Sequence, residues 1–283
     1  MKFLIIQENG EHEANRHYRE CFCAQRALIA LNQECDVWGL NHSNWPQMPD
    51  FNSYDVIIIL ENYDKGWLGK LPLRDCHAVK IVWAIDSHCR GTDYYKAIFD
   101  YFQCHYCLQA TKDYLPAIPN SSWFPNCFDD TLIKPLSIPK TIEVGFCGNL
   151  NNREGWLNWL NQNGQDVRRD IFVIGDKMVE AINSYKIHWN KNIANDLNYR
   201  NFETIGCNTV LLTDYNPQYK DLGFRHMENC VFYNAPTDCL IKIRELLANP
   251  TELARIAANG YELSKRHTYL ERMKGLVGFL TKT

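Results

Sequence analysis

The sequence predicts a two-domain α/β protein with a parallel sheet in each domain. A chain of 283 residues is longer than most single domains and suggests two domains of about 140 residues each. Continuous apolar runs over 55–60 and 79–85 have strand length and are typical of parallel strands that helices cover on both faces. Prolines 125, 135 and 139 separate two such alternating patterns and indicate a domain boundary.

The first domain is expected over residues 1–125 as a Rossmann-like unit. It opens with a strand, a helix with apolar residues at helical spacing, and a second strand, which is a βαβ pattern. The expected strands are 2–7, 34–40, 55–60, 79–85, 102–108 and 121–124, and the expected helices are 14–31, 93–99 and a short one near Lys112.

Residues 126–140 are interpreted as a linker, and 141–266 as a second Rossmann-like domain. A final helix within 267–283 could pack back on the first domain. Asn249 should end one helix and cap the next, since Pro250 follows it. The expected strands are 142–147, 170–174, 185–189, 208–213 and 229–233, and the expected helices are 154–161, 194–205, 237–248, 252–266 and 269–280.

The composition is that of a folded soluble protein. Hydrophobic residues make up 46% and charged residues 22% of the chain, which excludes a disordered polymer. The net charge of -3 gives no general attraction to phosphate backbones or anionic lipids, so nucleic acid is an unlikely partner.

The start of the chain predicts a cytoplasmic protein. Only four consecutive apolar residues, Phe3 to Ile6, precede a polar run, too few for a signal peptide or a membrane span. In that reducing compartment the twelve cysteines are expected to be buried thiols and not disulfides.

A strand followed by a glycine turn and a helix occupies residues 144–153. Backbone N–H groups at such a helix start suit a pyrophosphate, and Gly148 lets the phosphate come close. Asn149 lies in the same turn, and Arg153 could supply the countercharge. The alternative is an ordinary turn between a strand and a helix.

A second stretch of interest surrounds Arg200 and Glu203. These residues are three apart and share one face of the expected helix, which ends at Gly206. Taken alone, they form a surface ion pair. The strand that ends near Asn190 and the small-residue turn after Gly206 make the stretch more specific.

At this point the chain resembles the CgeB-like glycosyltransferases, which have the GT-B fold. The resemblance covers most of the chain and is strongest in its C-terminal half. The segments that carry it are SYKIHWN (184–190), YRNFETIGCNTVLLTDY (199–215), LLANPTELARIAANGYE (246–262) and RHTYLERM (266–273), with VWAIDSH (82–88) and WFPNCFDD (123–130) in the N-terminal half.

The resemblance implies two Rossmann-like domains whose sheets face a cleft, with a nucleoside-diphosphate sugar held by the second domain and an acceptor hydroxyl by the first. It implies that Glu203 holds the ribose hydroxyls, and a carboxylate can accept both hydrogen bonds. Arg200 would orient that carboxylate or reach the phosphates. The other residues implied for the donor are Gly148, Asn149 and Arg153 at the diphosphate and Asn190 near the nucleotide.

One position departs from the related retaining enzymes. They carry an acidic residue eight positions before the ribose-binding glutamate, and this chain has Asn195 there. A retaining outcome therefore does not carry over. The departure also keeps open a second interpretation, a protein that binds nucleotide-sugars without turnover.

Catalysis is assigned to the end of the apolar strand 79–85, because open parallel sheets bind ligands at the carboxyl ends of their strands. Asp86 is the candidate general base toward the acceptor, with His88 as the alternative. A helix N-cap explains Asp86 equally well. The stretch 8–12 (ENGEH), after the first strand, is a weaker candidate of the same kind.

No metal or cofactor is expected, since helix N-termini and Arg153 can offset the charge of the leaving diphosphate. Cys104 and Cys107 have the spacing of half a zinc site, but a zinc site needs a second pair.

A dinucleotide oxidoreductase is a weaker rival, because neither domain opens with a three-glycine fingerprint. Trp45 and Trp67 could stack on a sugar, although loop tryptophans more often pack.

Overall fold

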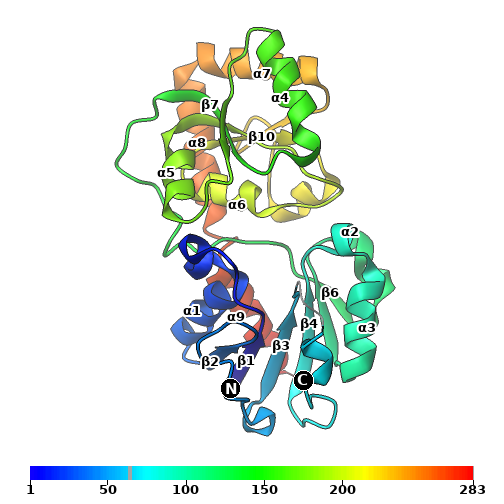
Figure 1. The fold of residues 1–283 in the computed structure, drawn as a ribbon. Helices are drawn as coiled ribbons and strands as arrows, with labels where there is room; N and C mark the ends of the chain where they lie inside the picture. Colours follow the sequence, from blue (N-terminus) through cyan, green and yellow to red (C-terminus); the bar gives the residue numbers. More distant parts are fainter. Residues whose placement is uncertain (63–65, 283) are drawn as a thin grey trace. The chain divides into compact units, whose positions relative to one another are not determined.

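A computed structural model describes residues 1–62 and 66–282, which fold into two compact units (Figure 1). The first unit contains Met1–Pro125 and Tyr269–Thr283, and the second contains Asn126–Thr268. The stretch 126–140, interpreted from the sequence as a linker, belongs to the second unit. One contact that joins this stretch to the second unit is a hydrogen bond of 2.6 Å from the Lys140 ammonium to Thr209 Oγ1.

The first unit is a sheet whose strands are all parallel, in the order β2-β1-β3-β4-β5-β6. The order reverses between β1 and β3, where such sheets bind ligands at the carboxyl ends of the strands. The strands are β1 (Lys2–Ile6), β2 (Glu34–Trp38), β3 (Val56–Leu60), β4 (Val79–Ala84), β5 (Tyr106–Gln109) and β6 (Ser121–Trp123), and the helices are α1 (Glu20–Ala30), α2 (Ser87–Arg90), α3 (Thr92–Phe102) and α9 (Tyr269–Leu280).

The final helix, α9, packs beside α1 in this unit (Figure 1). Its first residue, Tyr269, is buried and lies edge-on to the Trp83 ring, with centroids 6.2 Å apart. Trp83 also meets Phe124 at 5.1 Å. Aromatic pairs of this geometry stabilise a core beyond the area they bury, so the last helix is an integral part of the first unit.

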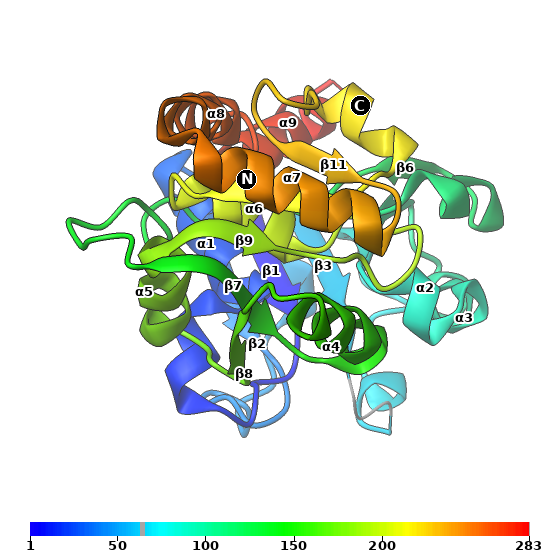
Figure 2. The same cartoon turned by 90° about the horizontal axis from the view of Figure 1, so that it is seen from above.

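The second unit has a parallel sheet in the order β11-β10-β9-β7-β8, which reverses between β7 and β9. Helix α4 packs beside α7, and α6 packs beside α8, around this sheet (Figure 2). The strands are β7 (Ile142–Gly148), β8 (Arg168–Ile171), β9 (Tyr185–Trp189), β10 (Val210–Asp214) and β11 (Val231–Tyr233), and the helices are α4 (Glu154–Gln162), α5 (Asp176–Ser184), α6 (Tyr199–Gly206), α7 (Pro236–Ala248) and α8 (Pro250–Ser264).

Two expected elements of the first unit are shorter than predicted. The helix expected over 14–31 divides at Arg19, whose backbone is extended (φ -69°, ψ 150°), into a 3₁₀ helix Glu13–Tyr18 and α1. The strand expected from 102 begins at Tyr106, because α3 continues to Phe102 and Gln103 then turns into the left-handed region (φ 53°).

Three predictions in the second unit also need correction. The strand expected over 170–174 is β8 instead, which ends before Phe172, a residue with φ 56°. No helix was expected over Asp176–Ser184, where the structure has α5. The helix expected from Ala194 starts only at Tyr199, because Asn198 is an extended N-cap. Asn249 does cap α8, accepting from the Glu252 N–H, as predicted.

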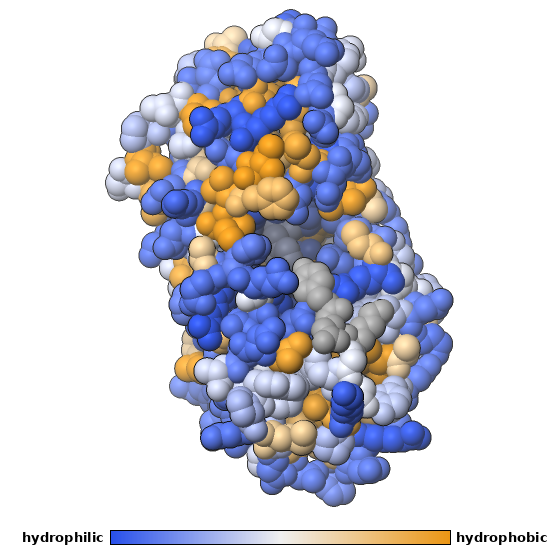
Figure 3. All heavy atoms as spheres, in the orientation of Figure 1, coloured by the Kyte–Doolittle hydropathy of each residue, from blue (hydrophilic) through white to orange (hydrophobic). Residues whose placement is uncertain are grey.

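The cysteines are almost all buried, as the sequence predicts. All twelve cysteines lie in the described part of the chain, none of them forms a disulfide, and only Cys89 is exposed. Figure 3 shows more hydrophobic surface on the drawn face of the second unit than on that of the first. Within residues 1–62 and 66–282, no helix is long and apolar enough to cross a membrane.

Candidate active site

Strand β7 ends in a turn that two arginines hold from either side. Arg200 Nε donates to the Cys147 carbonyl at 2.9 Å, and Arg153 Nη1 donates to the Asn149 carbonyl at 3.0 Å. Gly148, between them, has φ +153°, which side chains rarely adopt, and a Cβ there would lie 3.6 Å from the Phe146 ring and 4.0 Å from Arg200 Nε. Two guanidinium groups therefore flank an open stretch of backbone at the carboxyl end of the sheet.

Arg153 is a buried cation that the charges of Asp196 and Asp214 reach without forming an ion pair with it. Only 6% of the residue is exposed, and its Nε donates to the Lys191 carbonyl at 2.7 Å. No acidic side chain in the described ranges forms an ion pair with it. Burial lowers the pKa of this guanidinium from its usual value, yet arginine stays charged at neutral pH. An anion is the natural complement of such a group.

Helix α6 carries Arg200 and Glu203 on one face. Nη1 of Arg200 pairs with Oε2 of Glu203, and the two side chains are 22% and 11% exposed. Burial alone would lower the pKa of Arg200, but the Glu203 carboxylate outweighs it and raises that pKa. Oε1 of Glu203 makes no hydrogen bond to any residue the structure describes. The arginine thus orients the carboxylate and leaves one oxygen available.

The buried side chain of His188 connects β7 and α6 through hydrogen bonds at both ring nitrogens. Nε2 of His188 accepts from the Cys147 N–H at 3.2 Å, and Nδ1 lies 2.5 Å from Thr204 Oγ1, which donates to the Arg200 carbonyl. This pattern assigns the proton to Nδ1. Burial, and then Arg200 and Arg153, lower the pKa of His188 to about 3. The ring is therefore neutral at physiological pH.

Buried amides cross-link the carboxyl ends of β9 and β10. Asn190 Nδ2 donates to Asn201 Oδ1 at 3.0 Å and to Thr213 Oγ1 at 3.1 Å. Asn201 Oδ1 also accepts from the Tyr219 hydroxyl at 2.7 Å, and its Nδ2 donates to Asn192 Oδ1 at 3.0 Å. The Asn190 amide therefore bonds to other side chains of the protein, and these bonds position the loop before α6.

Asn195 lies in that loop and not on a helix. Its Oδ1 accepts from Asn216 Nδ2 at 2.9 Å, and Asn216 in turn caps the 3₁₀ helix Pro217–Leu222 through the Gln218 N–H. Asn195, which stands where related retaining enzymes have an acidic residue, therefore connects two loops at the carboxyl end of the sheet.

In the first unit, carboxylates follow two neighbouring strands. Glu61 comes after β3 and Asp86 after β4. The Tyr95 hydroxyl donates to Glu61 and accepts from the Asp86 N–H at 3.1 Å, while Arg90 Nε is 3.2 Å from Glu61 Oε2. Burial, and then the nearby Asp86 charge, raise the pKa of Glu61 to about 7. Glu61 can therefore exchange a proton near neutral pH.

Asp86 precedes α2, but its side chain makes no capping hydrogen bond, so the N-cap alternative loses support. His88 lies in α2 and is partly buried. Glu61 was missed from the sequence. The signal was present, because Glu61 follows the apolar run 55–60 just as Asp86 follows 79–85.

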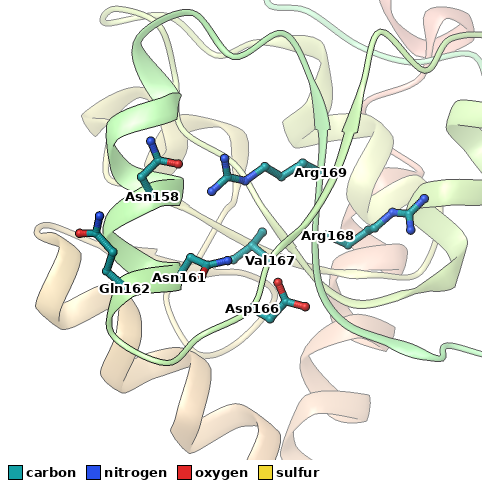
Figure 4. A pocket seen from close by; sticks show the side chains of 7 residues that line it. All are labelled: Asn158, Asn161, Gln162, Asp166, Val167, Arg168 and Arg169. Atoms are coloured by element: carbon teal, nitrogen blue, oxygen red, sulfur yellow. The ribbon is translucent and has the colours of Figure 1, made fainter.

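Two hollows lie elsewhere on the units. One of about 440 Å³, at the carboxyl end of β1, is lined by the stretch 8–12 together with Asn15, Arg19, Leu40 and Asn41. Another of about 590 Å³ lies between the C-terminal half of α4 and the start of β8, where Arg169 extends toward Asn158 (Figure 4). The second hollow is at the amino ends of the strands, away from the turn after β7.

The remaining sequence candidates lie in the core. Burial raises the pKa of Cys104 to about 12 and of Cys107 to about 11, which disfavours the thiolates that zinc requires. No group of three His, Cys, Asp or Glu side chains is placed to hold a metal in the described part of the chain. Trp45 and Trp67 pack on Trp38 with centroids 4.7 and 6.0 Å away.

Comparisons with known proteins identify the class. The family model described as "Glycosyl transferase-like" matches residues 130–278, so the chain belongs to that family. A comparison with curated protein sequences finds no match.

Three solved structures share the fold. Alr3699/HepE of Anabaena, in complex with UDP and glucose, has a TM-score of 0.72 at 11% identity over 100% of both chains. Sucrose-phosphate synthase of Thermosynechococcus elongatus has a TM-score of 0.70 at 12% identity over 100% of both chains. An alpha-glucosyltransferase in complex with UDP has a TM-score of 0.69 at 12% identity over 99% of this chain and 100% of that chain. The chain is a GT-B glycosyltransferase with two Rossmann-like units.

Proposed function

We propose that this glycosyltransferase uses a nucleoside-diphosphate sugar as donor and binds it at the turn after β7. The observation that carries the proposal is the pair of guanidinium groups, Arg153 and Arg200, bonded to the backbone on either side of Gly148. Similar folds have been solved with UDP, which makes UDP the first nucleotide to test. The segments quoted above favour the CgeB-like subgroup.

Each part of the nucleotide-sugar donor has a suitable binding partner at this turn. The diphosphate would lie against the backbone of Gly148 and Asn149, next to Arg153, with the start of α4 behind it. The ribose hydroxyls would donate to Glu203, whose Oε1 is open while Arg200 holds Oε2. Asn190 would position the nucleotide-binding loop through its amide network. Charge that develops on the leaving diphosphate is then stabilised without a metal or cofactor.

The acceptor would bind the first unit, near Asp86, with His88 as the alternative catalytic group and Glu61 as a further candidate. In an inverting reaction, the acceptor oxygen bonds to the anomeric carbon as the bond to the diphosphate breaks. The acceptor proton passes to the base. Of these groups, Glu61 has a pKa near 7, which suits a base at neutral pH. A cytoplasmic site of action fits this use of nucleotide-sugars.

A thermal-shift panel of UDP, GDP, ADP and their sugars tests the donor proposal. A nucleotide at one hundred times its Kd should stabilise the chain by about 2.7 kcal/mol. Arg153→Gln should weaken UDP binding about tenfold to a hundredfold, because it removes a charge-assisted contact. Arg168→Gln is the matched control, since that side chain is 63% exposed and pairs with Asp170. No stabilisation by any nucleotide, or equal losses in the two variants, would refute the proposal.

A binding protein without turnover is the second candidate, and Asn195 at the acidic position of related enzymes favours it. Measurement of nucleoside diphosphate released from UDP-sugars over a panel of sugar acceptors separates the two. Binding without release in every mixture would favour the second candidate.

A further inference from the structure

The hollow at the carboxyl end of β1 is lined by a guanidinium group that has no partner among the described residues. Arg19 lines this hollow, and its side chain forms neither a hydrogen bond nor an ion pair with the residues that the structure describes. Its Nε is buried. The group packs on Gly10, where a Cβ would come within 2.6 Å of Nη1 and 3.2 Å of Cδ. The glycine therefore leaves the space that the guanidinium occupies.

An amide beside it is also incompletely bonded. Asn9 Nδ2 donates to the Asn41 carbonyl at 3.3 Å. Its Oδ1 is buried and accepts from no donor within the described ranges. Buried polar groups without a partner cost stability unless a ligand or water supplies one. The hollow, of about 440 Å³, falls in the size range of small-molecule sites.

Arg19 and the start of α1 favour an anion at this part of the hollow, against the charges of the two carboxylates that also line it. Helix α1 begins directly after Arg19, so the positive end of its dipole lies at this edge. Two carboxylates also line the hollow. Glu8 is buried, and its charge acts on Tyr94 of α3, whereas Glu11 is exposed, where solvent screens its charge. The third ionisable neighbour, His12, is exposed as well.

We infer that this hollow binds the anionic group, phosphate or carboxylate, of a hydroxylated acceptor. Arg19 holds the anion and Asn9 Oδ1 accepts from a neighbouring hydroxyl. The inference rests on the proposed function, because it names the acceptor of that transfer. It selects sugar phosphates and sugar acids over neutral sugars.

Calorimetric titration of the full chain with glucose 6-phosphate, glucuronate and glucose tests the inference. The wild-type chain should bind at least one anionic probe more tightly than glucose, and the better probe distinguishes phosphate from carboxylate. Arg19→Gln should weaken that binding about tenfold to a hundredfold. Gly10→Ala should weaken it without removing the charge, because the methyl group displaces the guanidinium.

Arg16→Gln is the matched control, because Arg16 lies in the same segment but pairs with Glu13 at 3.3 Å. It should leave binding unchanged. The inference is overturned if the anionic probes bind no better than glucose, or if Arg19→Gln binds them as the wild type does. A loss with Arg153→Gln alone would place the anion in the second unit and overturn it too. UDP binding, measured in parallel, reports separately on the proposed donor site.

Discussion

The neutral state of His188 gives a pH dependence that can be calculated. An unfolded histidine titrates near 6.5, whereas in the folded chain the pKa of His188 is lowered to about 3. Between these values the unfolded state binds a proton that the folded state does not. Stability is therefore lost as the pH falls from about 6.5 to about 3. At pH 5 the loss from this one group is about 2 kcal/mol, and at pH 7 it is close to zero.

Urea unfolding at pH 7 and pH 5 measures this loss against His188→Gln, which cannot titrate. Because other groups titrate alike in both proteins, the wild type should lose about 2 kcal/mol more than the variant between the two pH values. At pH 7 the variant should itself be less stable by about 1–3 kcal/mol, since it disturbs the bonds to Cys147 and Thr204. Equal losses between pH 7 and pH 5 would show that His188 is not a buried neutral ring.

Other expected outcomes concern catalysis and packing. If Glu61 is the base, kcat should rise with pH through about 7, the raised pKa of that carboxyl, and Glu61→Gln should lower kcat about 100-fold or more and flatten the profile. Gly145→Ala should destabilise the chain by about 1–3 kcal/mol in thermal unfolding, because its Cβ would lie 2.4 Å from the Tyr185 ring. Gly155→Ala in α4, with open space around it, should instead raise stability by about 0.5 kcal/mol.

The alternation of apolar runs was enough to predict the fold. Parallel strands such as β3 and β4 are buried on both faces, so their apolar residues form continuous runs. Such runs differ from the spaced apolar residues of amphipathic helices. Element ends were less predictable, because single backbone conformations decide them. The residues before α6 contain Leu197 and Ala194 at helical spacing, yet side-chain bonds among Asn190, Asn198 and Asn201 hold this stretch as a loop.

Residues of the candidate site could be proposed from the sequence only where they belong to a pattern that is local in the chain. Gly148, Arg153, Arg200 and Glu203 belong to local patterns, and the structure brings Gly148 and both arginines together at one turn. The role of His188 could not be read from its sequence, because it depends on partners 41 and 16 residues away. Periodicity reports which face a residue lies on and not which hydrogen bond it completes.

The central claim, that Glu203 recognises the ribose of a nucleotide donor, is tested most directly by comparing two ligands in calorimetry. UDP contains a ribose, and pyrophosphate does not. Glu203→Ala should weaken UDP binding about tenfold to a hundredfold and reduce pyrophosphate binding far less, whereas Glu143→Ala, whose side chain is 61% exposed, should change neither. An unchanged UDP affinity in Glu203→Ala, or an equal loss for the two ligands, would contradict the claim.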